Sequence, residues 1–132
     1  MTIVLGYVPT PEGRAALAAA VEEARLRAER LVVLNTTRAD RLVDPRYAHD
    51  SDIAELEEVL RGAGVDHELR HHTSAQLAGD ELVALAGELD ATMLVIGLRH
   101  RSPVGKLLLG SAAQTVLLDA PCPVLAVKAP ER

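Results

Sequence analysis

The sequence predicts an α/β fold in which helices cover both faces of a doubly wound, mostly parallel five-stranded sheet. Short apolar runs of strand length alternate with longer segments of helical periodicity along the chain. The short runs are apolar almost throughout, which is typical of strands covered on both faces. Strands and helices that alternate through short connections build parallel sheets, because each helix returns the chain to the start of the next strand. No linker or internal repeat interrupts the 132 residues, so we expect one domain over residues 1–132.

The first part of the chain predicts a strand, a helix and a second strand. Residues 3–8 and 31–34 are continuous apolar runs of strand length. Between them, Thr10 is predicted to cap a helix that has Pro11 at its first position and extends to Arg30. The apolar residues of this helix mostly share one stripe: Ala16, Leu17, Ala20, Val21, Ala24 and Leu26.

The middle of the chain predicts a second helix and a polar strand. Residues 37–49 show no clear periodicity and are interpreted as a loop or short insertion. The Asp-Ser-Asp segment at 50–52 is predicted to cap a helix that ends at Gly62 and Gly64. Residues 65–72 are polar on both faces of a predicted strand, which suits the edge of the sheet. The apolar stripe of the helix consists of Ile53, Leu56, Val59 and Leu60.

The last part of the chain predicts two more helices and two more strands. Residues 80–89 and 111–118 have the helical period, and residues 93–96 and 124–127 are short apolar runs. Cys122 is the single cysteine, which excludes an internal disulfide, and its apolar context favours a buried small side chain over a reactive thiol.

Composition narrows the possible functions. A net charge of −5 argues against a general nucleic-acid binder, whose affinity depends on neutralising phosphates. Tyr7 and Tyr47 are the only aromatic residues, too few for a platform that stacks bases. No apolar stretch has the length needed to cross a bilayer, and the N-terminus lacks the pattern of a signal peptide. We therefore expect a cytoplasmic protein that binds neither nucleic acid nor membrane.

One segment of this acidic chain has the composition of an anion-binding loop. No Asp or Glu occurs between Asp90 and Asp119. This interval begins with an apolar strand that runs into Gly97, and after Gly110 we expect Ser111 to cap a helix. Backbone N–H groups of such a loop and of the helix start are free to bind an anion, and the helix dipole favours it. The cationic side chains between the glycines are Arg99, Arg101 and Lys106.

Metal binding and catalysis find little support. His67 and His71 share a face of one predicted strand but lie about 13 Å apart, too far to bind one ion. Ser111 has no evident general base near it in sequence, although His100 could approach it in space. The loop also lacks a carboxylate to hold Mg²⁺ or orient water. We therefore expect a binding protein and not an enzyme, with a slow ATPase as a further alternative.

The chain resembles the universal stress protein family. The resemblance rests on Gly97-x-x-His100, nine further residues and Gly110-Ser111, on the ending Ala120-Pro121-Cys122-Pro123-Val124-Leu125-Ala126-Val127, and on the helix start that follows the first strand. It implies the strand order 3-2-1-4-5, which places the first and fourth strands side by side. It also implies a homodimer, commonly through the fifth strands, here Val124–Val127. Some members bind ATP, whereas others act without nucleotide.

Two positions depart from the motif of the nucleotide-binding members, which is G-x2-G-x9-G-[S/T]. His100 replaces the second glycine, and Val8 stands where these members have an Asp that contacts the nucleoside. Adenine in the family is often held by backbone groups at the end of the second strand, a position that corresponds to Thr36. A backbone contact does not depend on the side chain, so Thr36 is compatible with adenine binding at this position.

These observations together predict a dimeric ATP-binding regulatory module of the stress response. ATP, accompanied by Mg²⁺, is the expected ligand, and no cofactor is expected to be essential. The alternative is a nucleotide-independent dimeric interaction protein whose phosphate loop is degenerate. The predicted nucleotide-binding residues are Val8, Pro9, Thr10, Thr36, Gly97, Arg99, His100, Arg101, Lys106, Gly110, Ser111 and Ala112.

Overall fold

The computed structural model describes residues 1–36, 45–72, 77–99 and 110–129, with backbone alone for residues 45–51. Five strands form one sheet in the order β3-β2-β1-β4-β5, and every neighbouring pair is parallel. The predicted fold class and strand order are thereby confirmed. The strands are β1 (Thr2–Tyr7), β2 (Arg30–Asn35), β3 (His67–His71), β4 (Met93–Leu98) and β5 (Val124–Lys128).

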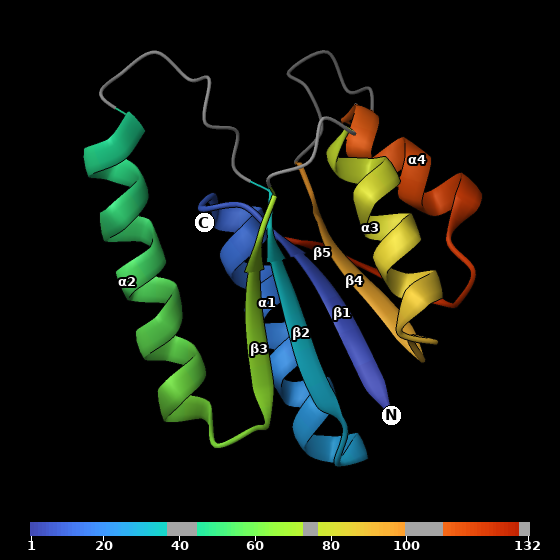
Figure 1. Ribbon diagram of the computed structural model, residues 1–132, viewed down its shortest axis with the longest axis horizontal. Helices are drawn as coiled ribbons and strands as arrows, with labels where there is room; N and C mark the ends of the chain where they lie inside the picture. Colours follow the sequence, from blue (N-terminus) through green and yellow to red (C-terminus); the bar gives the residue numbers. More distant parts are fainter. Residues whose placement is uncertain (37–44, 73–76, 100–109, 130–132) are drawn as a thin grey trace.

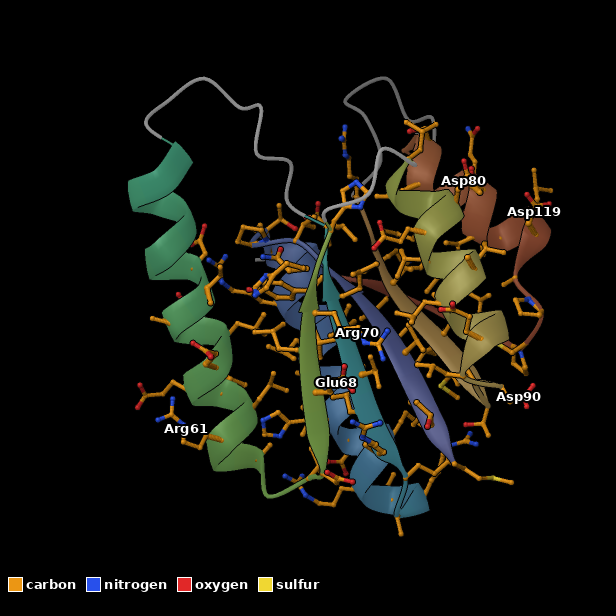
Figure 2. All side chains as sticks on the ribbon, viewed as in Figure 1. Arg61, Glu68, Arg70, Asp80, Asp90 and Asp119 are labelled. Atoms are coloured by element: carbon orange, nitrogen blue, oxygen red, sulfur yellow. The ribbon has the colours of Figure 1, made fainter. Side chains whose placement is uncertain are left out.

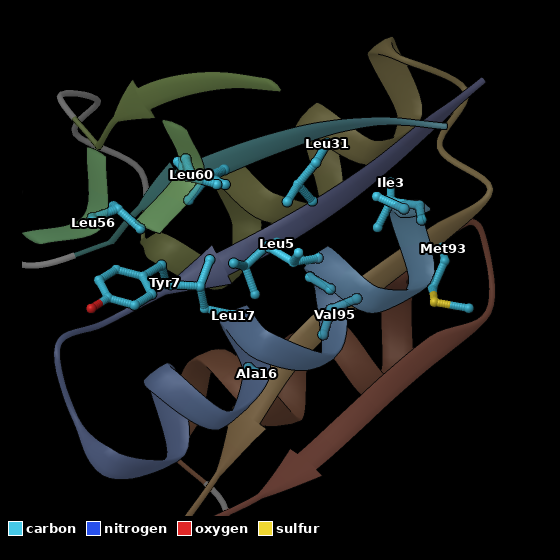
Figure 3. Close-up of a cluster of buried hydrophobic side chains, with 14 residues drawn as sticks. Ile3, Leu5, Tyr7, Ala16, Leu17, Leu31, Leu56, Leu60, Met93 and Val95 are labelled. Carbon is cyan, nitrogen blue, oxygen red and sulfur yellow. The ribbon is translucent and has the colours of Figure 1, made fainter. Parts of the chain in front are cut away.

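Helices cover both faces of the sheet (Figure 1). Helices α1 (Pro11–Arg27) and α2 (Pro45–Ala63) pack on one face, and α3 (Ala78–Glu88) and α4 (Ser111–Asp119) pack on the other. Successive residues of β1 divide between the two resulting cores: Leu5 packs with α1 and α2, whereas Val4 packs with α3 and α4. Figure 3 shows the first core, in which Leu5 and Val95 face Leu17 of α1. This double coverage explains why the central strands are apolar at consecutive positions.

Two features of the helices differ from the predictions. Helix α2 begins at Pro45 and not at residues 50–52. Proline suits the first helical position, because the N–H group that it lacks would have no intrahelical acceptor there. Leu26 is 71% exposed because it follows Glu22 and Glu23 by four and three residues, on the polar side of α1. Val59 is likewise 44% exposed, while Leu56 and Leu60 carry the contact of α2 with the core.

The connections that follow α1 and α2 use left-handed backbone. Gly64 ends α2 with a φ of +73°, as the sequence predicts. Ala28 ends α1 with a φ of 53°, and its N–H donates to carbonyl groups of the last turn. Strand β3, which follows Gly64, lies at the edge of the sheet as expected.

Within the described residues, no helix combines the length and apolar character needed to cross a membrane.

Candidate functional site

A cavity of about 460 Å³ lies where the carboxyl ends of β1 and β4 meet the starts of α1 and α4. Strands β1 and β4 are neighbours, and the order of the sheet reverses between them. In open parallel sheets, ligands bind in the crevice at this reversal. The cavity is lined by Val8, Pro9, Thr10, Glu12, Gly97, Leu98, Arg99, Gly110, Ala112 and Ala113.

Helix α4 begins at the cavity without a side-chain cap. Gly110 is the N-cap residue, so the prediction that Ser111 caps this helix is wrong. Ser111 is the first helical residue, one position too late to accept a bond from the N–H groups of the first turn. These N–H groups have no intrahelical acceptor, and the first turn contains no acidic residue. Within the described residues, the start of α4 therefore offers donors without a protein acceptor and the positive end of a helix dipole.

The two glycines of the motif have different structural roles. Gly97 belongs to β4 and not to a loop, because β4 extends two residues beyond its predicted end. A Cβ atom on Gly97 would lie 2.5 Å from the carbonyl oxygen of Glu12, so this glycine permits β4 to approach the start of α1. Gly110 has a φ of −64°, and a Cβ atom there would meet no atom of the described residues within 4 Å. Neither the backbone conformation nor the packing of the described residues requires a glycine at position 110.

On the other side of the cavity, the N-terminus of α1 is capped. The N–H of Gly13 donates to Oγ1 of Thr10 at 3.0 Å, as the sequence predicts for this cap. The hydroxyl group of Thr10 accepts in this bond, so its own proton is available to a ligand. Val8 lines the cavity with a half-buried aliphatic side chain that forms no hydrogen bond.

Among the described residues, Arg99 and Glu12 are the charged ones that line the cavity. Arg99 is exposed and has no ion pair with the part of the chain that the structure describes. Glu12 lies in the first turn of α1, and the sequence analysis did not assign it to the site. Only the adjacency of β1 and β4 brings this carboxylate-bearing residue beside the acid-free segment.

The structure brings most of the described predicted residues together. Val8, Pro9, Thr10, Gly97, Arg99, Gly110 and Ala112 all line the cavity, whereas Ser111 and Thr36 do not. Thr36 follows β2, and both its N–H and its hydroxyl donate to the carbonyl of Tyr7, at 2.9 and 3.0 Å. A backbone contact from Thr36 to a ligand would therefore use its carbonyl group. The predicted contacts of His100, Arg101 and Lys106 lie outside the described residues.

The cavity residues missed by sequence reasoning are Glu12, Leu98 and Ala113. The sequence could have identified Ala113 as a cavity residue, because it lies in the first helical turn after Gly110. Leu98 was missed because the end of β4 was placed two residues too early.

Among the described residues, the groups with a shifted pKa lie outside this cavity. Hydrogen bonds from Arg70 of β3 and from Arg30 of β2 lower the pKa of Glu68 on β3. Figure 2 shows Glu68 and Arg70 on this edge strand. Burial raises the pKa of Cys122, a half-buried side chain that packs against the core beneath α3 and α4. Among the described residues, no three His, Cys, Asp or Glu side chains lie close enough together to hold a metal ion.

Comparison with known proteins relates this architecture to one family. The universal stress protein family matches residues 1–128. A universal stress protein of Mycolicibacterium smegmatis is 48% identical over 126 residues, which are 96% of this chain and 96% of that protein. A universal stress protein of Thermus aquaticus is 34% identical over 135 residues, covering 96% of this chain and 98% of the relative.

Solved structures show the same relationship. The universal stress protein of Archaeoglobus fulgidus superimposes with a TM-score of 0.81 at 30% identity, covering 97% of this chain and 98% of the other. A structure of the Archaeoglobus fulgidus protein in complex with dAMP gives 0.74 at 25% identity over the same shares. A universal stress protein in complex with cAMP gives 0.70 at 27% identity over 98% of both chains. With its sheet order and its whole-length sequence match, the chain belongs to the universal stress protein family.

Proposed function

We propose that this protein is a dimeric adenine-nucleotide-binding module that acts by binding and not by catalysis. The nucleotide occupies the cavity between β1 and β4, with its phosphates at the start of α4 and near Arg99. The observation that carries this proposal is Gly110, a glycine that neither its backbone conformation nor its packing against the described residues requires. Its missing side chain leaves the uncapped helix start open, as close approach of a phosphate to the backbone requires.

The relatives support an adenine nucleotide as the ligand, because two related structures contain dAMP and cAMP. We propose ATP for this chain, with Mg²⁺ as its accompanying cation. His100, Arg101 and Lys106 add positive charge to the segment between Gly97 and Gly110. The proposed contacts to adenine and ribose come from the carbonyl of Thr36 and from the Pro9–Thr10 segment.

Val8 weakens the nucleoside half of this site. Its aliphatic side chain cannot replace the hydrogen bond of a carboxylate to the nucleoside, and losing a charged hydrogen bond costs about 1.5–3 kcal/mol. The hydroxyl proton of Thr10 offers a partial replacement, since Oγ1 of Thr10 only accepts in the cap of α1. Val8 and His100 are also the residues that favour the alternative function, a nucleotide-independent dimeric interaction protein.

The proposed dimer forms through the open edge of β5. The N–H of Leu94 donates to the carbonyl of Pro123 at 2.9 Å. In a parallel ladder, successive residues bond alternately to one neighbour and to the other. This hydrogen bond therefore means that the N–H and C=O groups of Leu125 and Val127 point toward β4 and those of Ala126 toward the open edge. An edge strand with free backbone groups is a template for pairing with a second copy. Leu125 and Val127 also pack against the core beneath α1, so their side chains contribute to the fold.

Native mass spectrometry of the purified protein, followed by titration with ATP, tests the nucleotide proposal. We expect a nucleotide adduct that disappears in Gly110→Val. The matched control is Gly87→Val on α3, because a Cβ atom at Gly87 also meets nothing within 4 Å and Gly87 does not line the cavity. The absence of an adduct and of a thermal shift at millimolar ATP would contradict the proposal. So would equal ATP affinity of wild type and Gly110→Val.

A further inference from the structure

A second, smaller cavity of about 150 Å³ lies between α1 and α2, on the face of the sheet opposite to α3 and α4. Its walls combine aliphatic side chains with a phenol and an ion pair. The lining residues are Tyr7, Arg14, Leu17, Ala18, Glu55, Leu56 and Val59. None of these residues lines the cavity between β1 and β4.

Tyr7 supplies a buried hydroxyl group to this cavity. The residue is 3% exposed, and its hydroxyl forms no hydrogen bond with the described part of the chain. Figure 3 shows the ring beside Leu56 and Leu17, with the hydroxyl oxygen directed away from the centre of the core. Burial raises the pKa of this phenol, so the group is neutral and retains its proton at physiological pH. A buried donor without a partner is uncommon because it loses its bond to water.

The charges around the cavity favour a neutral occupant. Nε of Arg14 lies 3.3 Å from Oε1 of Glu55, so this cation and this anion already compensate each other. Asp52 adds negative charge near Tyr7. An anionic ligand would be repelled by Asp52 and would compete with Glu55 for Arg14, and a cationic ligand would compete with Arg14 for Glu55.

We propose that the cavity between α1 and α2 binds a small neutral molecule that has a compact apolar body and one hydrogen-bond acceptor. The hydroxyl group of Tyr7 donates a hydrogen bond to this acceptor, and the apolar body contacts Leu17, Leu56 and Val59. A cavity of about 150 Å³ has room for a ligand the size of benzene. This site is independent of the nucleotide site.

Titration with cyclohexanone tests the proposal, because this molecule has a compact apolar ring and one carbonyl acceptor. We expect saturable shifts of the backbone amide signals of Ala18 and Val59 in two-dimensional NMR spectra. Tyr7→Phe keeps the ring and removes the donor, and it should weaken binding by about two- to tenfold. Ala18→Leu, at an exposed position on the cavity wall, should abolish the saturable shifts.

Ala54→Leu is the matched control, because Ala54 is an exposed alanine of α2 that does not line the cavity. This variant should bind cyclohexanone as the wild type does, and so should Gly110→Val. Non-saturable shifts would mean that the cavity holds water only and would overturn the proposal. Unchanged affinity in Tyr7→Phe or in Ala18→Leu would overturn it equally.

Discussion

Replacing each motif glycine with alanine separates its role in the fold from its role in binding. At Gly97, the new Cβ atom would lie 2.5 Å from the carbonyl oxygen and 2.8 Å from the carbonyl carbon of Glu12. Both atoms belong to the backbone, so the end of β4 or the start of α1 must move. At Gly110, the new Cβ atom would meet no described atom within 4 Å, and the φ of −64° is accessible to alanine.

The expected stabilities follow from these contacts. Overpacking of this kind costs about 1–3 kcal/mol, and a clash with backbone atoms belongs in the upper half of that range. Gly97→Ala should therefore lower the melting temperature by about 6–15 °C, at about 3–5 °C per kcal/mol for a domain of this size. Gly110→Ala loses only the preference of a helix N-cap for glycine over alanine, about 1 kcal/mol or less.

Guanidinium unfolding followed by far-UV circular dichroism measures both differences, and thermal melts provide a second measurement. Wild-type stability in Gly97→Ala would refute the close-approach explanation of this glycine. A stability loss in Gly110→Ala as large as that in Gly97→Ala would refute the inference that position 110 has no structural need for glycine.

Three further predictions concern backbone conformation, pH and assembly. Gly62→Ala in α2 should raise the free energy of unfolding by up to about 1 kcal/mol, whereas Gly64→Ala should lower it by about 1–2 kcal/mol. Both Cβ atoms meet open space and only Gly64 has a positive φ, so equal effects in denaturant titrations would contradict this explanation. Glu68→Gln should destabilise the protein at pH 7, because Arg70 lowers the pKa of this carboxyl and the resulting stability exists only while Glu68 is ionised. The difference from wild type should vanish as the pH falls through the lowered pKa, and a difference that persists in acid would exclude the ionic origin. Sedimentation equilibrium should give twice the chain mass of 14.1 kDa for the wild type and monomers for Ala126→Pro, with circular dichroism as the folding control; a monomeric wild type would refute the dimer.

The succession of elements was readable from local patterns. Residues 3–5 are apolar at every position, which predicts a strand covered on both faces, and Leu5 and Val4 do contact helices on opposite sides. The cap at Thr10 was predictable because a hydroxyl residue followed by Pro11 satisfies the first N–H groups of a helix locally. The start of α2 at Pro45 was not recognised, because the predicted cap at residues 50–52 competes with Pro45 as a helix start.

The candidate site was only partly predictable. The acid-free composition and the spacing of Gly97 and Gly110 identified the segment, because both are properties of a continuous stretch of sequence. The packing role of Gly97 was hidden, because it depends on Glu12, a residue far away in the chain.

The sequence by itself determined the succession of strands and helices along the chain, the net charge of −5 and the segment suited to an anion. These properties depend on neighbours within a turn or a strand, where periodicity and capping act. The tertiary structure decided which distant residues share a cavity: Glu12 with Arg99 in one, and Tyr7 with Glu55 in the other. It did so because strand order and helix packing set the distances between segments, and no local pattern encodes those distances.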